Sequence, residues 1–278
     1  DWTAVGDSGS LFGESVSSAG DVNGDGYDDV IIGARGYLNG RAYVFHGSPT
    51  GLVANPSWLR DSYSPGTWFG YSVSGAGDVN GDNFSDVVIG MFNYYYQGSR
   101  RIGAYIYTGS SSGLSQEAAW TASSELDISF GRSVSDAGDV NGDGYDDVIV
   151  GGNAGLLFYG HPDKGMYEDA DWTSPYLSTF VSNAGDVNGD GFGDVLIGRY
   201  DFGLFVEEYV YAFYGSSSGL PLTQNWSVTG FNHFSYSLST ALDFNNDGFD
   251  DILIGKGLTQ ANPAVKMYFG SATGLLTD

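Results

Sequence analysis

Five segments of the chain carry acidic and amide side chains in the pattern D-x-N-x-D-G-x-x-D. The first begins at Asp21 and places Asn23, Asp25 and Asp29 at its third, fifth and ninth positions. Ca²⁺ takes about six to eight oxygen ligands, and side-chain oxygens at positions 1, 3, 5 and 9 with a backbone carbonyl at position 7 supply such a set. The pattern therefore predicts about five Ca²⁺ ions, one in each segment. The predicted ligands are Asp21, Asn23, Asp25, Tyr27 and Asp29; Asp78, Asn80, Asp82, Phe84 and Asp86; Asp139, Asn141, Asp143, Tyr145 and Asp147; Asp186, Asn188, Asp190, Phe192 and Asp194; and Asp243, Asn245, Asp247, Phe249 and Asp251.

Positions 6 and 12 of the segments indicate which kind of calcium loop this is. Glycine at position 6 allows a sharp turn around the ion, and Asn83 replaces it in the second segment. Asparagine also tolerates a left-handed backbone, so we expect this site to form as well. An EF-hand needs a bidentate glutamate at position 12, whereas all five segments have isoleucine or valine there. Asp, Asn and Gly also make ordinary turns, but five copies with the same ligand spacing favour metal binding.

The predicted calcium sites are structural rather than catalytic. The ion uses the side-chain oxygens of each segment, and no nucleophile or repeated general base lies nearby in the sequence. Three carboxylates held together without the ion would repel one another, so we expect calcium binding to be coupled to folding.

The composition agrees with a calcium-loaded protein outside the cytosol. The formal charge is −24, and five Ca²⁺ would bring it to −14. This acidity argues against nucleic acid and anionic membranes as partners, and no apolar stretch is long enough for membrane insertion. The absence of cysteine excludes disulfide bonds and thiol catalysis. Low-affinity calcium loops suit calcium-rich surroundings, and no leader precedes Asp1, so we expect a mature or trimmed secreted or cell-surface protein.

A repeating fold must position the acidic segments, because other landmarks recur with them. The segments start 57, 61, 47 and 57 residues apart. Each unit shows strand signals in one order: an alternating run, the acidic segment, an apolar run, a third run such as residues 42–45, and a Gly-Leu or Gly-Met turn. A strand that carries a tryptophan, six residues after the Leu or Met, follows this turn in the first four units. The periodic tryptophans are expected to be packing residues.

These signals predict an all-β fold, a five-bladed β-propeller of four-stranded antiparallel blades. Strands that are apolar on both faces need cover on both sides, which neighbouring blades provide. A repeat of this length made only of strands is typical of a propeller. We expect one domain over residues 1–278, with units at about 6–62, 63–124, 125–176, 177–230 and 231–278 and an N-terminal strand at 1–5.

Trp2 predicts how the ring closes. Counting from Leu275 through the last residue and on to Trp2 gives five steps, close to the six that separate Leu or Met from tryptophan in the other units. Residues 1–5 should therefore form the outermost strand of the last blade, pairing near Met267 to Phe269 and covering its free edge. The alternative is that the chain is a fragment of a larger ring.

The residues around the first acidic segment resemble an FG-GAP repeat. The resemblance rests on Phe12-Gly13, on residues 15–17 and on the run from Ala19 to Ala34. Phe69-Gly70 and Phe130-Gly131 repeat the opening pair, and the resemblance spans essentially the whole chain. It implies a β-propeller like that of integrin α chains, with calcium in the loop between the first two strands of each blade.

Two features depart from the family pattern. Leu177-Ser178 and Phe234-Ser235 stand where Phe-Gly is expected. Integrin propellers have seven blades, whereas five are counted in this chain, and no inserted domain that would carry ligand is visible.

Irregular loops predict a binding face at the end of the blades opposite the acidic segments. Function is often grafted onto irregular loops of a regular repeat. Aromatic side chains with nearby amides and arginines suit sugar rings or protein side chains, so we expect a glycan or an extracellular protein as partner. The alternative is that these aromatics cover loop bases or blade ends. The candidate ligand-binding residues are Tyr63, Trp68, Tyr94, Tyr95, Tyr96, Arg199, Tyr200 and Phe202.

Three functions stay open: an adhesion or binding propeller, a polysaccharide lyase and a purely structural module. A lyase for acidic polysaccharides needs a cation beside the uronate and a Tyr or His as base; Arg199, Tyr200 and Tyr37 are candidates. The three histidines form no cluster in the sequence. We therefore expect a monomeric binding protein without catalytic residues.

Overall fold

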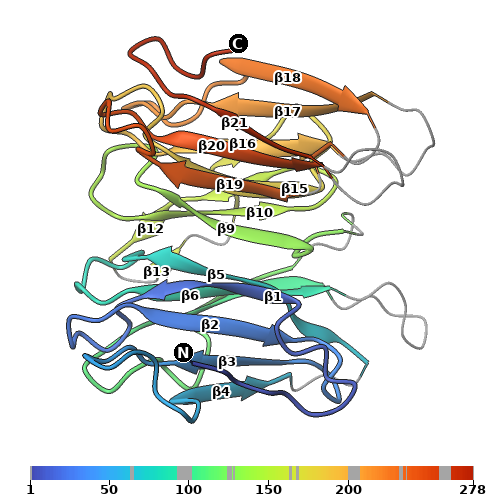
Figure 1. Ribbon diagram of the computed structural model, residues 1–278, viewed down its shortest axis with the longest axis vertical. Helices are drawn as coiled ribbons and strands as arrows, with labels where there is room; N and C mark the ends of the chain where they lie inside the picture. Colours follow the sequence, from blue (N-terminus) through green and yellow to red (C-terminus); the bar gives the residue numbers. More distant parts are fainter. Residues whose placement is uncertain are drawn as a thin grey trace.

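The described chain is built from antiparallel strands, as the sequence predicted (Figure 1). The computed structural model describes residues 2–62, 66–92, 102–123, 127, 129–162, 165–166, 169–199, 207–231, 234–235, 237–256 and 264–277. None of these residues belongs to a helix long and apolar enough to cross a membrane. The all-β class is confirmed, and the sheets are consistent with the blades of a β-propeller.

Five sheets follow one another along the chain, and we number them blades 1 to 5. Blade 1 consists of β1 (Ser15–Gly20), β2 (Asp29–Ala34), β3 (Arg41–Phe45) and β4 (Trp58–Asp61). Blade 2 consists of β5 (Trp68–Gly77), β6 (Asp86–Phe92), β7 (Gly103–Tyr107) and β8 (Trp120–Ala122). Blade 3 consists of β9 (Ser133–Gly138), β10 (Asp147–Gly151), β11 (Leu156–Phe158) and β14 (Trp172–Thr173), and the hairpin of β12 (Gly160–His161) and β13 (Gly165–Met166) precedes β14. Blade 4 consists of β15 (Phe180–Gly185), β16 (Asp194–Arg199), β17 (Glu207–Phe213) and β18 (Trp226–Phe231), and blade 5 of β19 (Ser237–Leu242), β20 (Asp251–Lys256) and β21 (Ala264–Tyr268).

Each acidic loop begins at an irregularity in the first strand and ends where the second strand starts. In blade 1 the register between β1 and β2 shifts between Ser18 and Gly20. Gly20 has a φ of 67°, a left-handed conformation that strains residues with a Cβ. Asp29, the ninth residue of the loop, opens β2. The other blades have a comparable shift, but Leu242 replaces the glycine in blade 5.

The hydrophobic core is divided among the seams between neighbouring blades. At each seam one tryptophan packs edge-to-face on an aromatic ring of the next blade's third strand, with 4.8–5.0 Å between ring centroids. Such pairs contribute about 0.5–1.5 kcal/mol beyond the burial of their area. The periodic tryptophans are therefore packing residues, as predicted. The pairs are Trp58 with Tyr107, Trp120 with Phe158, Trp172 with Phe213, and Trp226 with Tyr268.

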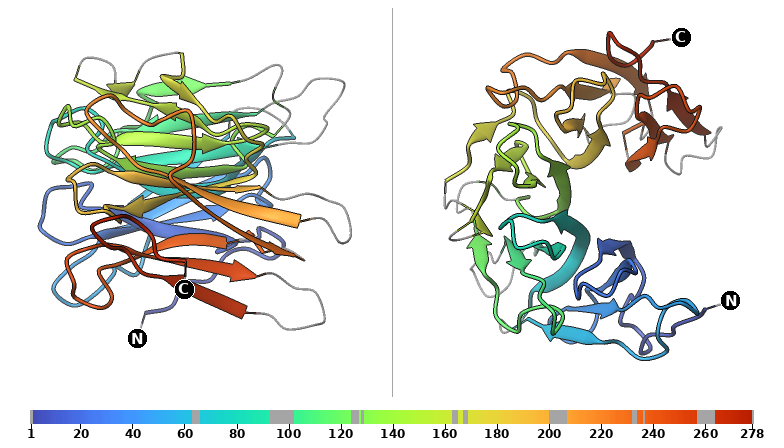
Figure 2. Two further views of the ribbon diagram at one scale, coloured as in Figure 1. Left: turned by 90° about the horizontal axis from the view of Figure 1, so that it is seen from above. Right: turned by 90° about the vertical axis from the view of Figure 1, so that its left-hand side faces the viewer.

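The five sheets of the described chain form an open arc, so neither the predicted count of five propeller blades nor the closure into a ring is confirmed (Figure 2). The sequence analysis placed Trp2 in a strand beside Met267 to Phe269, but Trp2 lies outside the strands. Its Nε1 donates to the Val53 carbonyl at 2.9 Å, and its ring packs on Phe45 at 5.0 Å. Trp58 makes the corresponding contacts with blade 2, so Trp2 takes the place of a tryptophan from a preceding blade. Because Trp2 is held on blade 1 and β21 lies at the far end of the arc, blade 5 has three strands among the described residues.

Candidate metal loops and the opposite face

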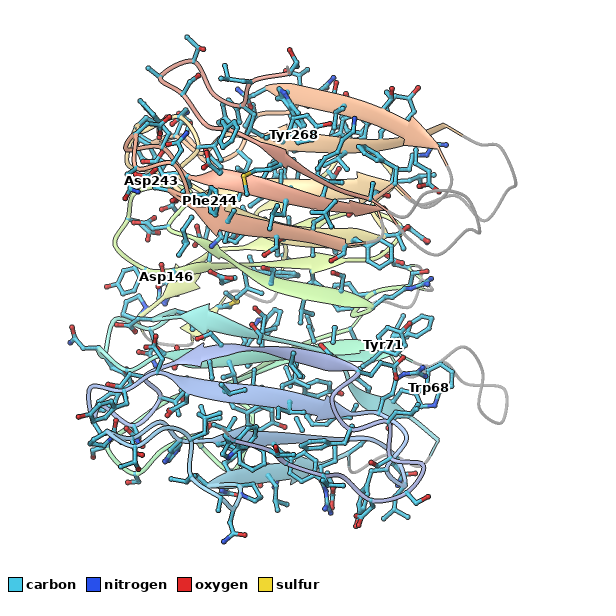
Figure 3. All side chains as sticks on the ribbon, in the orientation of Figure 1. Trp68, Tyr71, Asp146, Asp243, Phe244 and Tyr268 are labelled. Carbon is cyan, nitrogen blue, oxygen red and sulfur yellow. The ribbon has the colours of Figure 1, made fainter. Side chains whose placement is uncertain are left out.

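The five acidic loops lie at one end of the blades. Each loop connects the first and second strands of its blade. Figure 3 places Asp146 and Asp243 at this end and Trp68 and Tyr71 at the other. The acidic loops and these aromatic residues therefore occupy opposite faces, as the sequence predicted.

Each loop is folded around the side chain of its first residue. In loop 1, Oδ1 of Asp21 accepts hydrogen bonds from the N–H groups of Gly24 and Asp25. Oδ2 of Asp21 accepts a bond from the Gly26 N–H at 2.7 Å, and Asn23 Oδ1 accepts one from the Asp25 N–H at 2.9 Å. Loops 2 to 4 repeat these bonds. This bonding explains why Asp, Asn and Gly recur at fixed positions, because their side chains replace backbone partners in a tight turn.

The ninth residue of each loop has a structural role that the ligand pattern did not reveal. Asp29 is fully buried, and its two oxygens accept hydrogen bonds from the N–H groups of Val22 at 3.0 Å and Gly47 at 2.7 Å. Gly47 follows the third strand, so this carboxylate ties the acidic loop to the neighbouring turn. The same pair of bonds is made by Asp86, Asp147, Asp194 and Asp251.

Burial makes the ionised form of these carboxylates costly. Burial raises the pKa of Asp86 to about 7 and the pKa of Asp147 and Asp194 to about 8. The two backbone N–H groups that donate to each carboxylate act in the opposite direction and lower its pKa. Burial also raises the pKa of Asp29. Repulsion from acidic residues at loop positions 1 and 5 raises the pKa of the first three further. A cation in the loop would offset both effects, because an opposite charge favours the ionised form.

Neighbouring loops are stacked through an aromatic side chain and a glycine. Phe84, at position 7 of loop 2, lies against Gly24 at position 4 of loop 1, where a Cβ would come within 2.6 Å of its ring. The Ser85 N–H donates to the Asp21 carbonyl at 3.1 Å across the same seam. Position 7 therefore contributes a packing side chain in addition to the carbonyl predicted as a ligand. The later contacts pair Tyr145 with Gly81, Phe192 with Gly142 and Phe249 with Gly189.

The loops carry oxygen donors that suit Ca²⁺, but the ligands are not already gathered around one point. Among the described residues, no three acidic or histidine side chains form a group that could hold a metal ion. A carboxylate has about four lone-pair positions. Asp21 uses three of them in hydrogen bonds and Asp25 uses two, so both keep capacity for an ion. The chemistry of the donor set fits calcium, and the assembled site stays a prediction.

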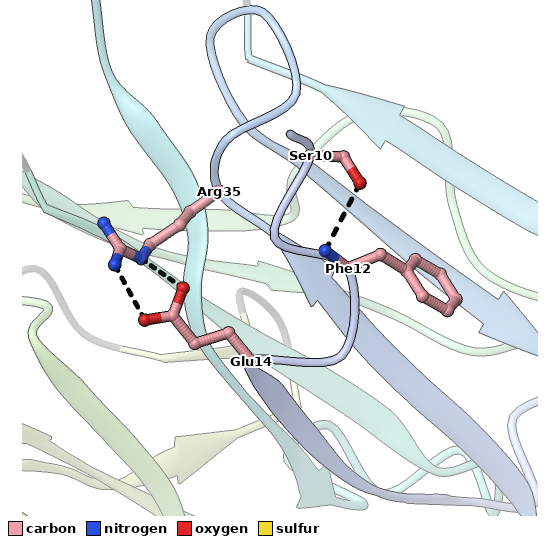
Figure 4. A network of polar contacts seen from close by, with 4 residues as sticks. All are labelled: Ser10, Phe12, Glu14 and Arg35. Carbon is pink, nitrogen blue, oxygen red and sulfur yellow. Dashed lines mark hydrogen bonds and ion pairs between the residues drawn. The ribbon is translucent and has the colours of Figure 1, made fainter. Parts of the chain in front are cut away.

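At the opposite face, Trp68 belongs to a cluster of aromatic and charged side chains. Its ring stacks on Tyr71 with 6.2 Å between centroids and 17° between planes. The guanidinium of Arg35 lies 5.0 Å from the centre of each ring. It also forms a bidentate ion pair with Glu14, at 2.6 and 2.7 Å (Figure 4). We call these four residues the Arg35 cluster.

Trp68 is one of the ligand-binding residues predicted from the sequence, whereas Tyr71 and Glu14 are not among them. Both residues directly follow the Phe-Gly pair of their blade. Arg132 holds the same position in blade 3, and its guanidinium lies 5.8 Å from the Phe92 ring. The position after the Phe-Gly pair is therefore a signal that could have found this surface.

The other predicted ligand-binding residues fall into two groups. Arg199 ends β16 in blade 4, and its backbone carbonyl accepts a hydrogen bond from Ser235 Oγ at 3.0 Å. The remaining candidates lie outside the described residues; they are Tyr63, Tyr94, Tyr95, Tyr96, Tyr200 and Phe202.

The described residues considered for lyase chemistry do not come together. His46 follows β3 at the acidic end, where its Nδ1 lies 3.0 Å from Asn23 Nδ2. Arg199 lies at the end of β16 that is remote from loop 4. Tyr37 is covered by the Arg41 guanidinium, 3.8 Å from its ring centre. His46 therefore lies at the other end of the blades from Arg199, and Tyr37 belongs to blade 1 whereas Arg199 belongs to blade 4.

Comparison with known proteins gives matches to one repeat type. Residues 12–45, 69–100 and 234–262 match the FG-GAP repeat. Integrin alpha-6 of Gallus gallus is 37% identical over 85 residues, which is 30% of this chain and 8% of that protein. Integrin alpha-7 of Homo sapiens is 39% identical over 82 residues (29% of this chain, 7% of that protein), and integrin alpha-PS5 of Drosophila melanogaster is 42% identical over 89 residues (30% and 9%). The matched part thus covers less than a tenth of each of these relatives.

Proposed function

Because three segments of this chain match the FG-GAP repeat and parts of it are similar to integrin alpha chains, we propose that it is a calcium-stabilised extracellular binding module. Its partner, a protein or a glycan, docks on the face opposite the acidic loops. The acidic loops supply stability, and the opposite face supplies recognition.

The observation that supports this division is how differently the two faces use their polar groups. At the acidic end, the loop side chains bond to their own backbone and the ninth carboxylate bonds to the neighbouring turn. At the other end, Arg35 and Trp68 are held in place but keep part of their surface open, with 21% of the Arg35 side chain exposed. A rigid surface of this kind loses little conformational entropy when a partner binds.

The chemistry of the Arg35 cluster indicates what the partner carries. The stacked rings of Trp68 and Tyr71 offer an apolar surface for a sugar ring or an aromatic side chain. Arg35 adds a planar cation that pairs with carboxylates, and Glu14 already uses it in this way. A carboxylated sugar or an acidic protein segment next to an aromatic group fits this surface.

Calcium is proposed for the five acidic loops, with the ligands predicted from the sequence. The ion would supply positive charge among carboxylates whose pKa burial has raised, and so favour their ionised form. We propose no catalytic role, because Tyr37 and Arg199, the described candidates for base and cation, belong to blades 1 and 4, and His46 lies at the acidic end.

Binding of a glycan array and of a panel of extracellular proteins tests the proposal, with calcium present throughout. Trp68→Ala should weaken binding of any positive probe at least about tenfold, since central aromatic residues carry much of the energy of an interface. Tyr27→Ala is the matched control, because Tyr27 is a partly exposed aromatic residue at the acidic end. Loss of binding in Tyr27→Ala but not in Trp68→Ala would place recognition on the wrong face, and silence toward every probe would favour a structural module.

A further inference from the structure

A hollow of about 250 Å³ lies between the first strands of blades 1 and 2, and we call it the channel pocket. The first strands of the blades line the inner side of the arc, where β1 lies beside β5 and β5 beside β9 (Figure 2). The pocket is bordered by β1 and β5, by Ser85 of loop 2 and by Asp136 of β9. Since one water molecule occupies about 30 Å³, the pocket has room for a small organic molecule.

The first reason for the channel pocket is a missing side chain in β5. Four of the five first strands carry a polar side chain two residues before the end of the strand, whereas β5 has Gly75 there. Three of these polar side chains accept a hydrogen bond from the backbone N–H two residues further along. Gly75 therefore leaves open a position that the other blades fill. The equivalent residues are Ser18, Asp136, Asn183 and Thr240.

The second reason is a shortened side chain at position 8 of loop 2. Loops 1, 3 and 5 have aspartate at this position, and loop 2 has Ser85. In the seam between blades 2 and 3 the aspartate is Asp146, and a Cβ on Gly77 would lie 2.1 Å from its Oδ2. In the seam between blades 1 and 2 the shorter Ser85 lies against Gly20 instead. The channel pocket lies where these two smaller residues, Gly75 and Ser85, meet.

The wall of the channel pocket offers oxygen acceptors and one negative charge. Asp136 contributes a carboxylate, and none of the lining residues is basic. Hydroxyl and carboxylate oxygens both accept hydrogen bonds, and a charged donor forms the stronger bond with a carboxylate. The hydroxyl groups belong to Ser17, Ser18, Ser74 and Ser85.

Asp136 is held in the wall by neutral donors. Asn183 Nδ2 donates to its Oδ2 at 2.7 Å, and Ser135 Oγ donates to its Oδ1 at 3.3 Å. Loss of surrounding water raises the pKa of Asp136; the bond from Asn183 lowers it, and repulsion from Asp146 raises it again. A cation in the channel pocket would favour the ionised form of Asp136, because an opposite charge offsets both desolvation and repulsion.

We propose that the channel pocket binds a small organic molecule through a primary ammonium group, which pairs with Asp136 and donates to the serine hydroxyls beside it. An ammonium group has three N–H donors and no acceptor, which matches a wall of acceptors with one carboxylate. The site lies at the acidic end of the first strands, away from the Arg35 cluster, so it does not depend on recognition at the opposite face.

The wall suits an organic cation better than a bare metal ion. Ca²⁺ takes about six to eight oxygen ligands, several of them carboxylates, whereas a single carboxylate lines this pocket. The described part of the chain also gathers no three acidic or histidine side chains that could hold a metal ion. Amino sugars and short alkylamines both carry the required group, and the experiment separates them.

Isothermal titration calorimetry of the whole chain in saturating calcium tests the proposal, with glucosamine, glucose and putrescine as probes. Glucosamine should bind at least about tenfold more tightly than glucose, which has a hydroxyl in place of the ammonium group, because a charged donor roughly doubles the strength of a hydrogen bond. Tighter binding of glucosamine than of putrescine would identify an amino sugar as the ligand class, and the reverse order would identify an alkylamine. Both orders support the ammonium contact.

Two variants locate the binding site. Asp136→Asn keeps the size of the side chain and should weaken binding of the preferred amine at least about tenfold. Asp61→Asn is its control, since it removes an exposed carboxylate of β4. Gly75→Ser restores the side chain of the other blades and should also abolish binding by filling the pocket. Thr240→Ser is the matched control for this change, because it places serine at the same position of blade 5.

The melting temperature of each variant in calcium checks that it is folded. Silence toward both amines overturns the proposal, whatever binds at the opposite face. Equal affinity for glucose and glucosamine overturns it too, as does binding that survives both Asp136→Asn and Gly75→Ser. Loss of amine binding when calcium is raised further would place the amine in an acidic loop and would likewise contradict the channel pocket.

Discussion

The two ends of the arc meet the same requirement in different ways. At blade 1, Trp2 and Phe12 pack over the apolar sheet face turned away from blade 2, so that Ile32 and Phe45 are buried. At blade 5, Phe244 and Val265 are exposed in the described chain, at 66% and 69%. The comparison shows that a repeat does not by itself determine how its ends are covered, because a few residues outside the pattern decide this.

The acidic loops differ in the same way along the arc. In loops 1 to 4 the glycine at position 4 receives an aromatic ring of the next blade, and the carbonyl of the first residue accepts a hydrogen bond from an N–H group of that blade. Loop 5 has Asn246 at this position, and its Phe249 ring packs on Gly189 of the preceding loop. Loops 2 to 4 therefore have a neighbouring loop on both sides, whereas loops 1 and 5 have one on a single side.

Calcium removal is expected to have the largest effect. Five sites filled at about 100 times their dissociation constant would each contribute about 2.7 kcal/mol, and each kcal/mol shifts the melting temperature by about 2–4 °C in a chain of this size. Excess chelator should therefore lower the melting temperature by tens of degrees in calorimetry, and added calcium should restore it. An unchanged melting curve in chelator would contradict the calcium proposal.

Substitutions in single loops sharpen the comparison. Asp190→Asn in loop 4 should lower the calcium-dependent melting temperature more than Asp247→Asn in loop 5, because loop 4 supports seams on both sides. Equal shifts from the two variants would mean that the stacking of loops does not matter for stability.

Exchanging the residue at position 4 tests the seam more directly. Gly189→Asn copies loop 5 into loop 4 and should lower the free energy of unfolding by about 1–3 kcal/mol, because the new Cβ would lie 2.6 Å from the Phe249 ring. Asn246→Gly, the reverse change at the uncovered loop, should shift it by less than about 1 kcal/mol. Denaturant unfolding of both variants in calcium measures the difference, and a neutral Gly189→Asn would contradict the stacking contact.

Much of the architecture could be predicted from the sequence because its signals are local. The alternating and apolar runs fall on the observed first and second strands, and the periodic tryptophans pack as expected. The family resemblance is confirmed by the FG-GAP matches and the integrin alpha relatives. These conclusions depend on spacing within one unit, which a sequence displays directly.

The arrangement of the ends could not be predicted in the same way. The count from Leu275 to Trp2 gives the phase of the repeat, whereas closure depends on the angle between blades, which side-chain packing at the seams sets. The bonds of Asp29 to Gly47 and of Arg35 to Glu14 were also hidden, because the partners are 18 and 21 residues apart and lie on different strands or turns. Contacts of this kind become visible only when the strands are placed in space.

The smallest expected effect concerns two leucines in the same strained conformation. Leu242 and Leu38 both have positive φ, 53° and 46°, and both are exposed, at 66% and 82%. Replacing either by glycine removes the clash of Cβ with the backbone, about 1–2 kcal/mol, but gives the unfolded chain more freedom, which offsets roughly half of it. Each variant should therefore gain up to about 1 kcal/mol in denaturant unfolding. Leu38 lies in the turn between β2 and β3 and Leu242 ends β19, so the two variants test the same backbone effect at separate places. A loss of stability in both variants would contradict the argument from strain.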